Sequence, residues 1–567
     1  METMPSEKLH KNNRKILILS AFLSILLVAA VSIPLARRIH HTAAAAAVIK
    51  STCDATLYPE LCLSTLAAAA PKTAAVKSSR DVLITALRYT ISTVERNFFT
   101  VQKVGRARRQ SLTAREKGAL HDCLETIDDT LDELRLSEAE LVDLGRLGNS
   151  SLAAHKENLL TLLSAAQTNQ DSCLDGFSHD SADQKVRAAL VAGQTHVFRL
   201  VSNVMAIIKN LSFKESAAAA AEGRRLPEKW PEWLPAGDRR LLQESAVEAN
   251  VTVAADGSGD YLTVSEAVAD APLKSSRRYV IRIKAGVYRE NVVIPKKKTN
   301  LMFVGDGRTT TIITASKNVV DGSTTFNSAT VVSDSNAAVV GGGFLARDIT
   351  FENTAGPSKH QAVALRVNAD LCAFYRCDIL AYQDTLYVHS LRQFYTGCLI
   401  SGTVDFIFGN AEVVFQDCDI HARRPNPGQR NMVTAQSRKD PNQNTGIVIH
   451  GCRVGATSDL RPVQGDFPTY LGRPWKEHSR TIVMQSEISD VIAPAGWHEW
   501  SGDFALATLF YAEYGNTGAG AGTEGRVDWE GFRVLTSAEE AEEFTVGNFI
   551  GGGNWLPETG FPHSLGL

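Results

Sequence analysis

A repeat of about 21 residues in the C-terminal half of the chain constrains the fold more than any other feature. Four short segments place an aromatic or aliphatic residue before a cysteine and an aliphatic residue after it. Their cysteines lie 21, 20 and 34 residues apart, at Cys377, Cys398, Cys418 and Cys452. A coil of a parallel β-helix uses about that many residues, and its coils stack ~4.8 Å apart like other paired strands. For residues 249–567 we therefore predict a parallel β-helix, with these cysteines packed inside it as small apolar side chains.

The same interval relates four polar residues. Asp384 and Asp405 lie 21 residues apart, and Gln361 lies 22 residues before Gln383. In a stack of coils a constant interval places side chains above one another. We therefore expect the two carboxyl groups and the two amides to meet in space.

Two acids on adjacent coils suit either a glycosidase, whose retaining form holds its carboxyl groups ~5 to 5.5 Å apart, or an esterase. The glutamines favour the esterase. A neutral amide donates a hydrogen bond to an oxyanion, a stabilisation worth roughly 3 to 4 kcal/mol per donor, and a glycosidase forms no oxyanion. Two close carboxylates do not both ionise easily, so one is expected to keep its proton at mildly acidic pH and act as the general acid while the other attacks.

The composition indicates a secreted protein of more than one domain. The chain has 567 residues, too many for one ordinary domain, and its formal net charge of -3 argues against a nucleic-acid partner. Nine cysteines and three glycosylation sequons, at Asn149, Asn210 and Asn250, fit a secretory route. The cysteines of the C-terminal half are accompanied by neither CxxC pairs nor clustered histidines, so we expect no metal site.

Residues 1–42 are expected to form a cytoplasmic tail and a membrane-targeting segment. An apolar run over 16–36 follows four basic residues and ends at Arg37 and Arg38. Its length is near the ~20 residues of a bilayer-spanning helix and exceeds the ~7 to 15 residues of a usual signal-peptide core. A signal anchor is the favoured interpretation, and a cleaved signal peptide is the alternative.

Residues 43–211 carry apolar side chains at helical spacing with few prolines, which predicts an antiparallel four-helix bundle. Its four cysteines are Cys53, Cys62, Cys123 and Cys173. Three disulfide pairings are possible. A bridge from Cys53 to Cys62 would close a short hairpin-like segment and leave Cys123 to join Cys173.

The stretch over 212–248 has the composition of a linker, with a run of alanines, a Trp- and Pro-rich part and two arginine pairs. Each pair is followed by leucine. For either pair alone a solvated charge cluster is the favoured interpretation. Two copies at a domain junction favour proteolytic processing instead, with the second site, ending at Leu242, as the better one. Upstream, His121 beside Asp122 is expected to be a surface pair.

The helical half resembles a known family. Residues 52–62 and 169–177 are similar to the pectin methylesterase inhibitor fold. This resemblance implies a four-helix bundle with disulfides from the first to the second and from the third to the fourth cysteine. It also implies a non-catalytic pro-region.

Residues 249–567 resemble plant pectin methylesterases. Four motifs carry the resemblance, at residues 360–366, 381–387, 402–409 and 470–475. It implies a right-handed single-stranded parallel β-helix that removes methyl groups from homogalacturonan without a metal or organic cofactor. The basic motifs of the linker are likewise similar to those at which precursors of this family are cut.

The resemblance also implies a role for each site residue. Asp405 is the nucleophile, and Asp384 is the general acid and then the general base. Gln361 and Gln383 form the anion hole, and Arg473 holds and orients Asp405.

Further positions follow from the same resemblance. Trp475 would form a platform for a sugar ring, and Thr325 would contact the substrate. A disulfide is implied between Cys398 and Cys418, which lie on adjacent coils.

Two rival functions remain at this point. One is a β-helical pectin depolymerase, but a lyase would need a calcium site of clustered acids and a hydrolase would have less use for two glutamines. The other is a precursor that acts mainly as an inhibitor or wall-binding protein. The expected partners are homogalacturonan, the chain's own helical domain and separate inhibitor proteins, and the expected location is the cell wall.

Overall fold

The computed structural model describes residues 45–69, 78–147, 152–178, 183–210, 248–334 and 343–567. The apolar run over 16–36, the sequon at Asn149 and the processing site at Leu242 lie outside these ranges. Among the described residues, no helix is long and apolar enough to cross a membrane.

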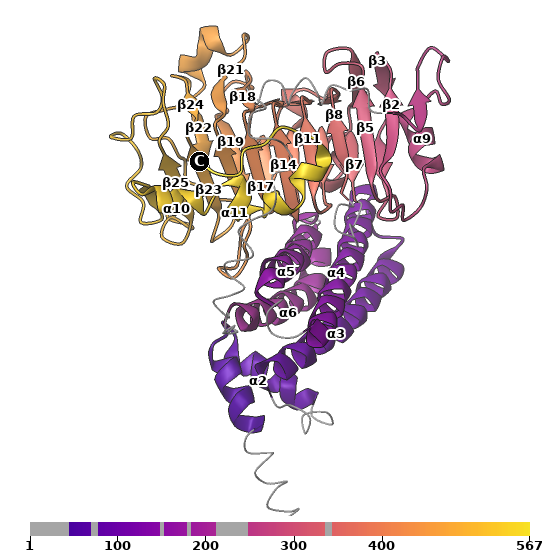
Figure 1. Cartoon of the computed structure of the whole chain (residues 1–567), viewed down its shortest axis with the longest axis vertical. Coiled ribbons are helices and arrows are strands. Elements are labelled where there is room, and N and C mark those ends of the chain that lie inside the picture. Colours follow the sequence, from indigo (N-terminus) through magenta and orange to yellow (C-terminus); the bar gives the residue numbers. More distant parts are fainter. Residues whose placement is uncertain (1–44, 70–77, 148–151, 179–182, 211–247, 335–342) are drawn as a thin grey trace, which may run out of the picture.

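The C-terminal half is a parallel β-helix built from three sheets, as predicted (Figure 1). From β2 to β24, successive strands pass from one sheet to the next, so that each complete coil adds one strand to each sheet. Every strand pair is parallel, which is the arrangement that stacked coils require. The fold therefore aligns residues one coil apart.

The strands of the three sheets have the following bounds. The first sheet contains β1 (Val251–Val253), β2 (Tyr279–Ile283), β5 (Leu301–Gly305), β8 (Leu345–Arg347), β11 (Cys372–Tyr375), β14 (Arg392–Thr396), β17 (Glu412–Gln416), β20 (Gly446–His450), β23 (Arg480–Met484), β25 (Phe510–Tyr514) and β26 (Phe532–Val534). The second contains β4 (Val292–Ile294), β7 (Val331–Ser333), β10 (Leu365–Val367), β13 (Leu386–Val388), β16 (Ile407–Gly409), β19 (Asn431–Gln436) and β22 (Thr469–Gly472). The third contains β3 (Gly286–Arg289), β6 (Thr311–Ala315), β9 (Thr350–Asn353), β12 (Asp378–Leu380), β15 (Leu399–Gly402), β18 (Asp419–Ala422), β21 (Arg453–Ala456) and β24 (Glu487–Ile488).

Aromatic side chains and cysteines form columns inside the β-helix. The ring of Tyr395 stacks between Phe374 and Phe415 at centroid distances of 4.7 and 4.8 Å. Cys377, Cys398, Cys418 and Cys452 are all buried, which confirms the predicted internal stack. These columns fill the interior because identical positions recur on successive coils.

The predicted disulfide between Cys398 and Cys418 is not formed, and both residues are free thiols. Parallel stacking points the two side chains in the same direction, and each sulfur instead contacts carbonyl oxygens. The Cys398 Sγ lies 3.5 Å from the carbonyl oxygen of Phe374, and the Cys418 Sγ lies 3.5 Å from that of Tyr395. The column consists of thiols that pack as small apolar groups.

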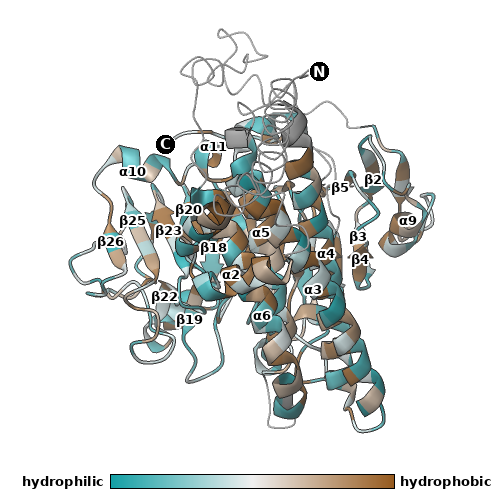
Figure 2. Ribbon diagram, turned by 90° about the horizontal axis from the view of Figure 1, so that it is seen from below, coloured by the Kyte–Doolittle hydropathy of each residue, from teal (hydrophilic) through white to brown (hydrophobic). Residues whose placement is uncertain are grey.

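The N-terminal half is a helical bundle. It contains α2 (Pro59–Ala68), α3 (Ser79–Arg108), α4 (Ala114–Leu147), α5 (Leu152–Asp175) and α6 (Asp183–Asn210). Thr113 and Glu116 cap α4 reciprocally, each accepting a hydrogen bond from the other's backbone N–H, at 2.7 and 3.1 Å. The predicted four-helix bundle is confirmed by the four long helices α3 to α6 (Figure 2).

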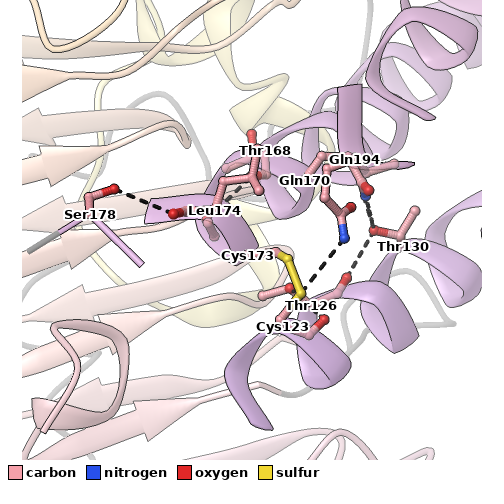
Figure 3. The surroundings of a disulfide bond; sticks show 11 residues. Cys123, Thr126, Thr130, Thr168, Gln170, Cys173, Leu174, Ser178 and Gln194 are labelled. Atoms are coloured by element: carbon pink, nitrogen blue, oxygen red, sulfur yellow. Dashed lines mark hydrogen bonds between the residues drawn. A yellow bond between two sulfur atoms is a disulfide. The ribbon is translucent and has the colours of Figure 1, made fainter. Parts of the chain in front are cut away.

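Both predicted disulfides of the bundle are present. Cys53 joins Cys62 across nine residues, and Cys123 on α4 joins Cys173 on α5. Figure 3 shows the second bridge beside Thr126, Thr130 and Gln170, which are buried between the helices. The bridge ties together two of the helices that contact the β-helix.

Shorter elements complete the fold. They are α9 (Val264–Asp270), α10 (Ala538–Glu542), α11 (Val546–Phe549) and the 3-10 turns η3 (Phe326–Ser328), η4 (Pro357–Lys359), η5 (Arg461–Asp466), η6 (Gly552–Asn554) and η7 (Leu556–Thr559). Thr263 and Glu266 cap α9 reciprocally. Apolar residues of the C-terminal segment cover the outer face of the first sheet.

The bundle lies directly against the β-helix (Figures 1 and 2). Leu162 and Ala165 of α5 pack against Leu391, which follows β13. Thr161 donates a 2.8 Å hydrogen bond to Glu412. The C-terminal end of α5 is thereby held over the coils that carry Asp384 and Asp405.

Candidate active site

Asp384 and Asp405 occupy equivalent positions on adjacent coils. Each lies two residues before a strand of the second sheet, and Leu386 of β13 pairs with Ile407 of β16. The two aspartates are thus one strand spacing apart, ~4.8 Å along the ladder. Both have a left-handed backbone, with φ of 62° and 52°, which aspartate tolerates better than most residues. Both side chains are buried, so their charges are only weakly screened by water.

Arg473 distinguishes the two acids. Its Nε and Nη2 atoms donate to Asp405 Oδ1 and Oδ2 at 2.8 and 2.6 Å, a bidentate ion pair. Asp384 has no such partner among the described residues. Burial, followed by the negative charge of Asp405, raises the pKa of Asp384 well above its ordinary value. A raised pKa favours the protonated form of Asp384, the acid to which the family resemblance gives the role of proton donor.

A cavity of about 350 Å³ opens above the two aspartates. Its lining includes Gln361 and Gln383, so the structure brings all four recurring polar residues together as expected. Within the described ranges, neither side-chain amide is hydrogen-bonded to another protein group, and both are free to donate to a bound molecule. A carbonyl oxygen that gains negative charge in this cavity would find these donors already in place.

The other predicted site residues also line this cavity. Trp475 follows β22, and Thr325 precedes η3, so the two come from opposite ends of the second sheet. Trp500 contributes a ring that lies 4.4 Å from the guanidinium carbon of Arg473. Trp497, in contrast, is buried and packs on Tyr511 at 4.3 Å, so it is a core residue.

Part of the cavity wall comes from the helical bundle, which sequence reasoning did not anticipate. Ser172, Asp175, Gly176 and Ser178, at the C-terminal end of α5, line the same cavity as the catalytic candidates. Lys476, the residue after Trp475, donates to Asp175 at 3.1 Å. The bundle therefore covers this side of the cavity.

Asp122 shows that the expectation of a surface pair is wrong. It is only 2% exposed and accepts hydrogen bonds from Thr324 and Asn327 of the β-helix. Burial raises the pKa of Asp122 to about 7. The sequence feature that indicates a docking face here is the row of acids along α4 at helical spacing, although the same row also suits a solvated face.

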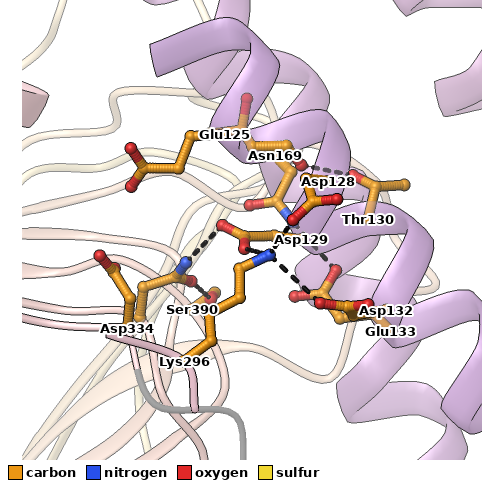
Figure 4. Close-up of polar contacts among 12 residues, drawn as sticks. Glu125, Asp128, Asp129, Thr130, Asp132, Glu133, Asn169, Lys296, Asp334 and Ser390 are labelled. Carbon is orange, nitrogen blue, oxygen red and sulfur yellow. Dashed lines mark hydrogen bonds and ion pairs between the residues drawn. The ribbon is translucent and has the colours of Figure 1, made fainter. Parts of the chain in front are cut away.

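The acidic row of α4 meets a lysine of the β-helix (Figure 4). Lys296 Nζ lies 2.8, 2.5 and 3.2 Å from carboxylate oxygens of Asp128, Asp129 and Asp132. Asn368 donates to Asp129 at 2.9 Å, and burial raises the pKa of Asp129 to about 6. This cluster is the polar centre of the contact between the two halves.

Further contacts extend the interface along α5. Lys439 pairs with Asp171 at 2.8 Å. Ser172 and His389 are linked by a 2.7 Å hydrogen bond, and the other ring nitrogen of His389 lies 2.8 Å from Asn368 Oδ1. Burial lowers the pKa of His389 well below its ordinary value, so the ring is neutral and accepts from the Ser172 hydroxyl.

The described residues contain no cluster of three or more histidine, cysteine, aspartate or glutamate side chains placed to hold a metal ion. A carboxylate paired with a guanidinium, a protonated carboxyl group and two amide donors suit acyl transfer.

Fold and site together define a carboxylic ester hydrolase of the parallel β-helix type. The family model for pectinesterase matches residues 250–554, and the model for the plant invertase/pectin methylesterase inhibitor matches residues 47–207. The chain therefore belongs to the pectinesterase family and carries an N-terminal inhibitor-like domain.

Relatives and a solved structure agree with this assignment. Pectinesterase/pectinesterase inhibitor U1 of Solanum lycopersicum is 63% identical over 93% of this chain and 90% of its own length. Pectinesterase/pectinesterase inhibitor 3 of Arabidopsis thaliana is 57% identical over 100% of this chain and 99% of its own. The solved pectin methylesterase from carrot, 73% identical with a TM-score of 0.56, covers 57% of this chain and 99% of its own. The carrot chain is matched over almost its whole length by little more than half of this chain, so we expect region 249–567 to fold by itself.

Replacement of Gln383 by alanine tests the oxyanion donors. We expect kcat for methanol release from methylated pectin to fall roughly 10²- to 10³-fold in the isolated region 249–567, because the amide acts where charge develops. Gln464→Ala, a change on η5 outside the cavity, is the matched control and should leave kcat unchanged. Equal kcat in the Gln383 variant and the parent would contradict this role.

Proposed function

We propose that the chain hydrolyses the methyl esters of homogalacturonan, releasing methanol and leaving a free carboxylate on the polymer. The observation that carries this proposal is the unequal pair of aspartates. Arg473 holds Asp405 in a bidentate ion pair, and burial beside that charge keeps Asp384 protonated. One site thus contains a nucleophile and a general acid.

The proposed reaction has two steps. An Asp405 oxygen attacks the ester carbonyl carbon, and the resulting oxyanion accepts hydrogen bonds from the amides of Gln361 and Gln383. The bond to the methoxy oxygen breaks as Asp384 gives its proton to that oxygen, so methanol leaves and an acyl-enzyme anhydride remains. A water molecule then gives its proton to Asp384 and attacks the anhydride, which releases the polymer acid and restores Asp405.

The site favours an esterase over a depolymerase. Two free amide donors serve an oxyanion, which cleavage of a glycosidic bond does not form. A calcium-dependent lyase would need clustered acids, and Arg473 already occupies both oxygens of Asp405. The ester is therefore the bond that this arrangement is equipped to break.

Methanol release by region 249–567, with polymer length followed in parallel, tests the activity. We expect methanol at constant length and, in Asp405→Ala, a loss of roughly 10⁴-fold or more, the scale seen when a hydrolase loses a residue of its catalytic triad. Asp417→Ala is the control, because Asp417 has a similar left-handed backbone, with φ of 55°, on the exposed surface. A shortened polymer without methanol would overturn the proposed reaction.

We further propose that the helical domain inhibits the enzyme in cis until it is removed. Residues at the end of α5 wall the cavity above the aspartates, and the ion pairs of Lys296, Lys439 and Lys476 hold α4 and α5 in place. A polysaccharide cannot pass through the space that α5 fills. This arrangement supports an inhibitory role over one in targeting alone.

The route to the cell wall is part of the same proposal. The apolar segment over 16–36 directs the chain into the secretory pathway, as an anchor or as a cleaved signal, and a protease cuts at Leu242. Glycosylation takes place at Asn149, Asn210 and Asn250, of which Asn250 is exposed. After this cut, separate inhibitor proteins of the same helical fold bind the surface that the helical domain covered.

Reversing one charge tests the inhibition. In the full-length chain, Lys296→Glu places a fourth carboxylate among three, and we expect methanol release to rise roughly 10-fold, equivalent to ~1.4 kcal/mol of weakened docking. Lys297→Glu, at the neighbouring exposed position, should have no such effect. An equal rise in the isolated region 249–567 would show that docking is not the cause.

Inhibition should also depend on pH. Docking raises the pKa of Asp129 to about 6 and that of Asp122 to about 7, mainly through burial. The docked form then binds more protons than the separated form, whose carboxyl groups titrate near 4. The contribution of these two carboxyl groups to docking is therefore fully present below pH ~4, and it is lost as pH rises through 6 and 7.

The ratio of full-length activity to that of region 249–567, measured between pH ~5 and ~7.5, checks this linkage. We expect the ratio to increase with pH, because division by the activity of the isolated region removes the titration of Asp384. A ratio that stays constant or falls would contradict the linkage.

A further inference from the structure

Two adjoining cavities form a groove on the β-helix, and the docked helical domain leaves one of them uncovered. A second cavity of about 340 Å³ adjoins the first and shares Gln383 and Arg473 with it. Its lining residues are His360, Gln383, Val404, Gly428, Gln429, Arg430, Met432, Arg473 and His498. All of them belong to the β-helical region, in contrast to the first cavity with its wall from α5. Two of these lining residues, His360 and Arg430, are exposed, so the cavity is open beside the docked bundle.

Arg430 gives the open cavity a cation that no described carboxylate neutralises. Arg473, the other arginine of the lining, is occupied by Asp405. The Arg430 side chain is exposed, and its Nη1 donates to His498 Nε2 at 2.8 Å. That partner is a neutral acceptor, so the charge of Arg430 and its remaining N–H groups stay available.

His498 holds Arg430 in a defined position. Because Nε2 accepts from Arg430, the proton of the ring is on Nδ1, which donates to the backbone oxygen of Glu499 at 2.6 Å. The ring of Tyr470 packs edge-on against His498 at 4.8 Å. The Glu499 carboxylate lies 3.4 Å from Nδ1, on the opposite edge of the ring from Arg430. The guanidinium is therefore positioned by neutral contacts and not by an ion pair.

A second observation at the same cavity concerns His360. Its backbone has φ of 54° and ψ of -137°, a region that residues other than glycine rarely adopt. The residue is exposed, lines the cavity and directly precedes Gln361 of the anion hole. Strained backbone of this kind persists where the surrounding structure enforces it, and it is concentrated at ligand sites.

We propose that the open cavity binds an unesterified galacturonate unit of the polymer, through its carboxylate and Arg430, while the helical domain is still docked. This inference rests on the proposed pectin substrate. It adds that a de-esterified unit of the polymer lies in the open cavity, beside the cavity that contains the two aspartates. An arginine with free N–H groups binds a carboxylate in a bidentate, charge-assisted manner, whereas a methyl ester offers no charge. The full-length chain would thus hold acidic pectin without turning it over.

Titration of the full-length chain with the unmethylated hexamer of galacturonic acid tests this binding. We expect measurable affinity, reduced about 10-fold or more in Arg430→Gln, the size of effect expected for a lost charged hydrogen bond. Arg430→Lys, which keeps the charge, should lose less. Arg461→Gln, at an exposed arginine of η5 outside the cavity, is the matched control and should bind as the parent does. The fully methylated hexamer should bind more weakly than the acid.

Three results would overturn the proposal. They are equal binding by Arg430→Gln and the parent, equal binding of the methylated and unmethylated hexamers, and binding by region 249–567 with none by the full-length chain. Each of these leaves methanol release by region 249–567 unaffected. A failure of this proposal is therefore distinguishable from a failure of the proposed esterase activity.

Discussion

The hydrogen-bonded register between adjacent coils is the constraint on which the site depends. The N–H of Asp384 donates to Val404 O at 3.1 Å, and Leu386 lies opposite Ile407. A shift of one residue in a parallel ladder would turn every side chain to the other face and separate the aspartates. Close packing at the same turn leaves little freedom, because a Cβ on Gly402 would lie 2.3 Å from Phe406 Cβ. Glycine there is a condition for the two acids to meet.

The register makes the aspartates equivalent, and their surroundings make them different. Arg473, which directly follows β22, forms its bidentate ion pair with Asp405 and not with Asp384. Asp384 then bears both the desolvation of its buried position and the charge of its neighbour, so its pKa is raised. The proposed division into nucleophile and acid thus rests on one guanidinium placed asymmetrically between two like groups.

Sequence spacing predicted the aspartates, the glutamines and the cysteine column because all are consequences of one repeat. It did not exclude a bridge between Cys398 and Cys418, since Cα spacing alone permits one. The direction in which stacked side chains point decides that question, and the thiols contact carbonyl oxygens instead. Asp122 was misjudged for a related reason. Helical periodicity shows which residues share a face, but not whether that face meets solvent or another domain.

Both parts of the groove carry cations, but the bundle supplies acidic partners to those of one part only, among the described residues. Where the bundle docks, it presents Asp129, Asp171 and Asp175 to lysines of the β-helix. The chain thereby fills that part with its own carboxylates. Among the described residues, the ion pair of Lys476, beside Trp475, is the one with Asp175 of the bundle. The part it leaves open instead carries Arg430 without an acidic partner among the described residues. A polymer that bears carboxylates binds to Arg430 in the open part. In the docked part it competes with the acids of the bundle for the lysines. Docking and substrate binding therefore both depend on attraction between carboxylates and the cations of the groove.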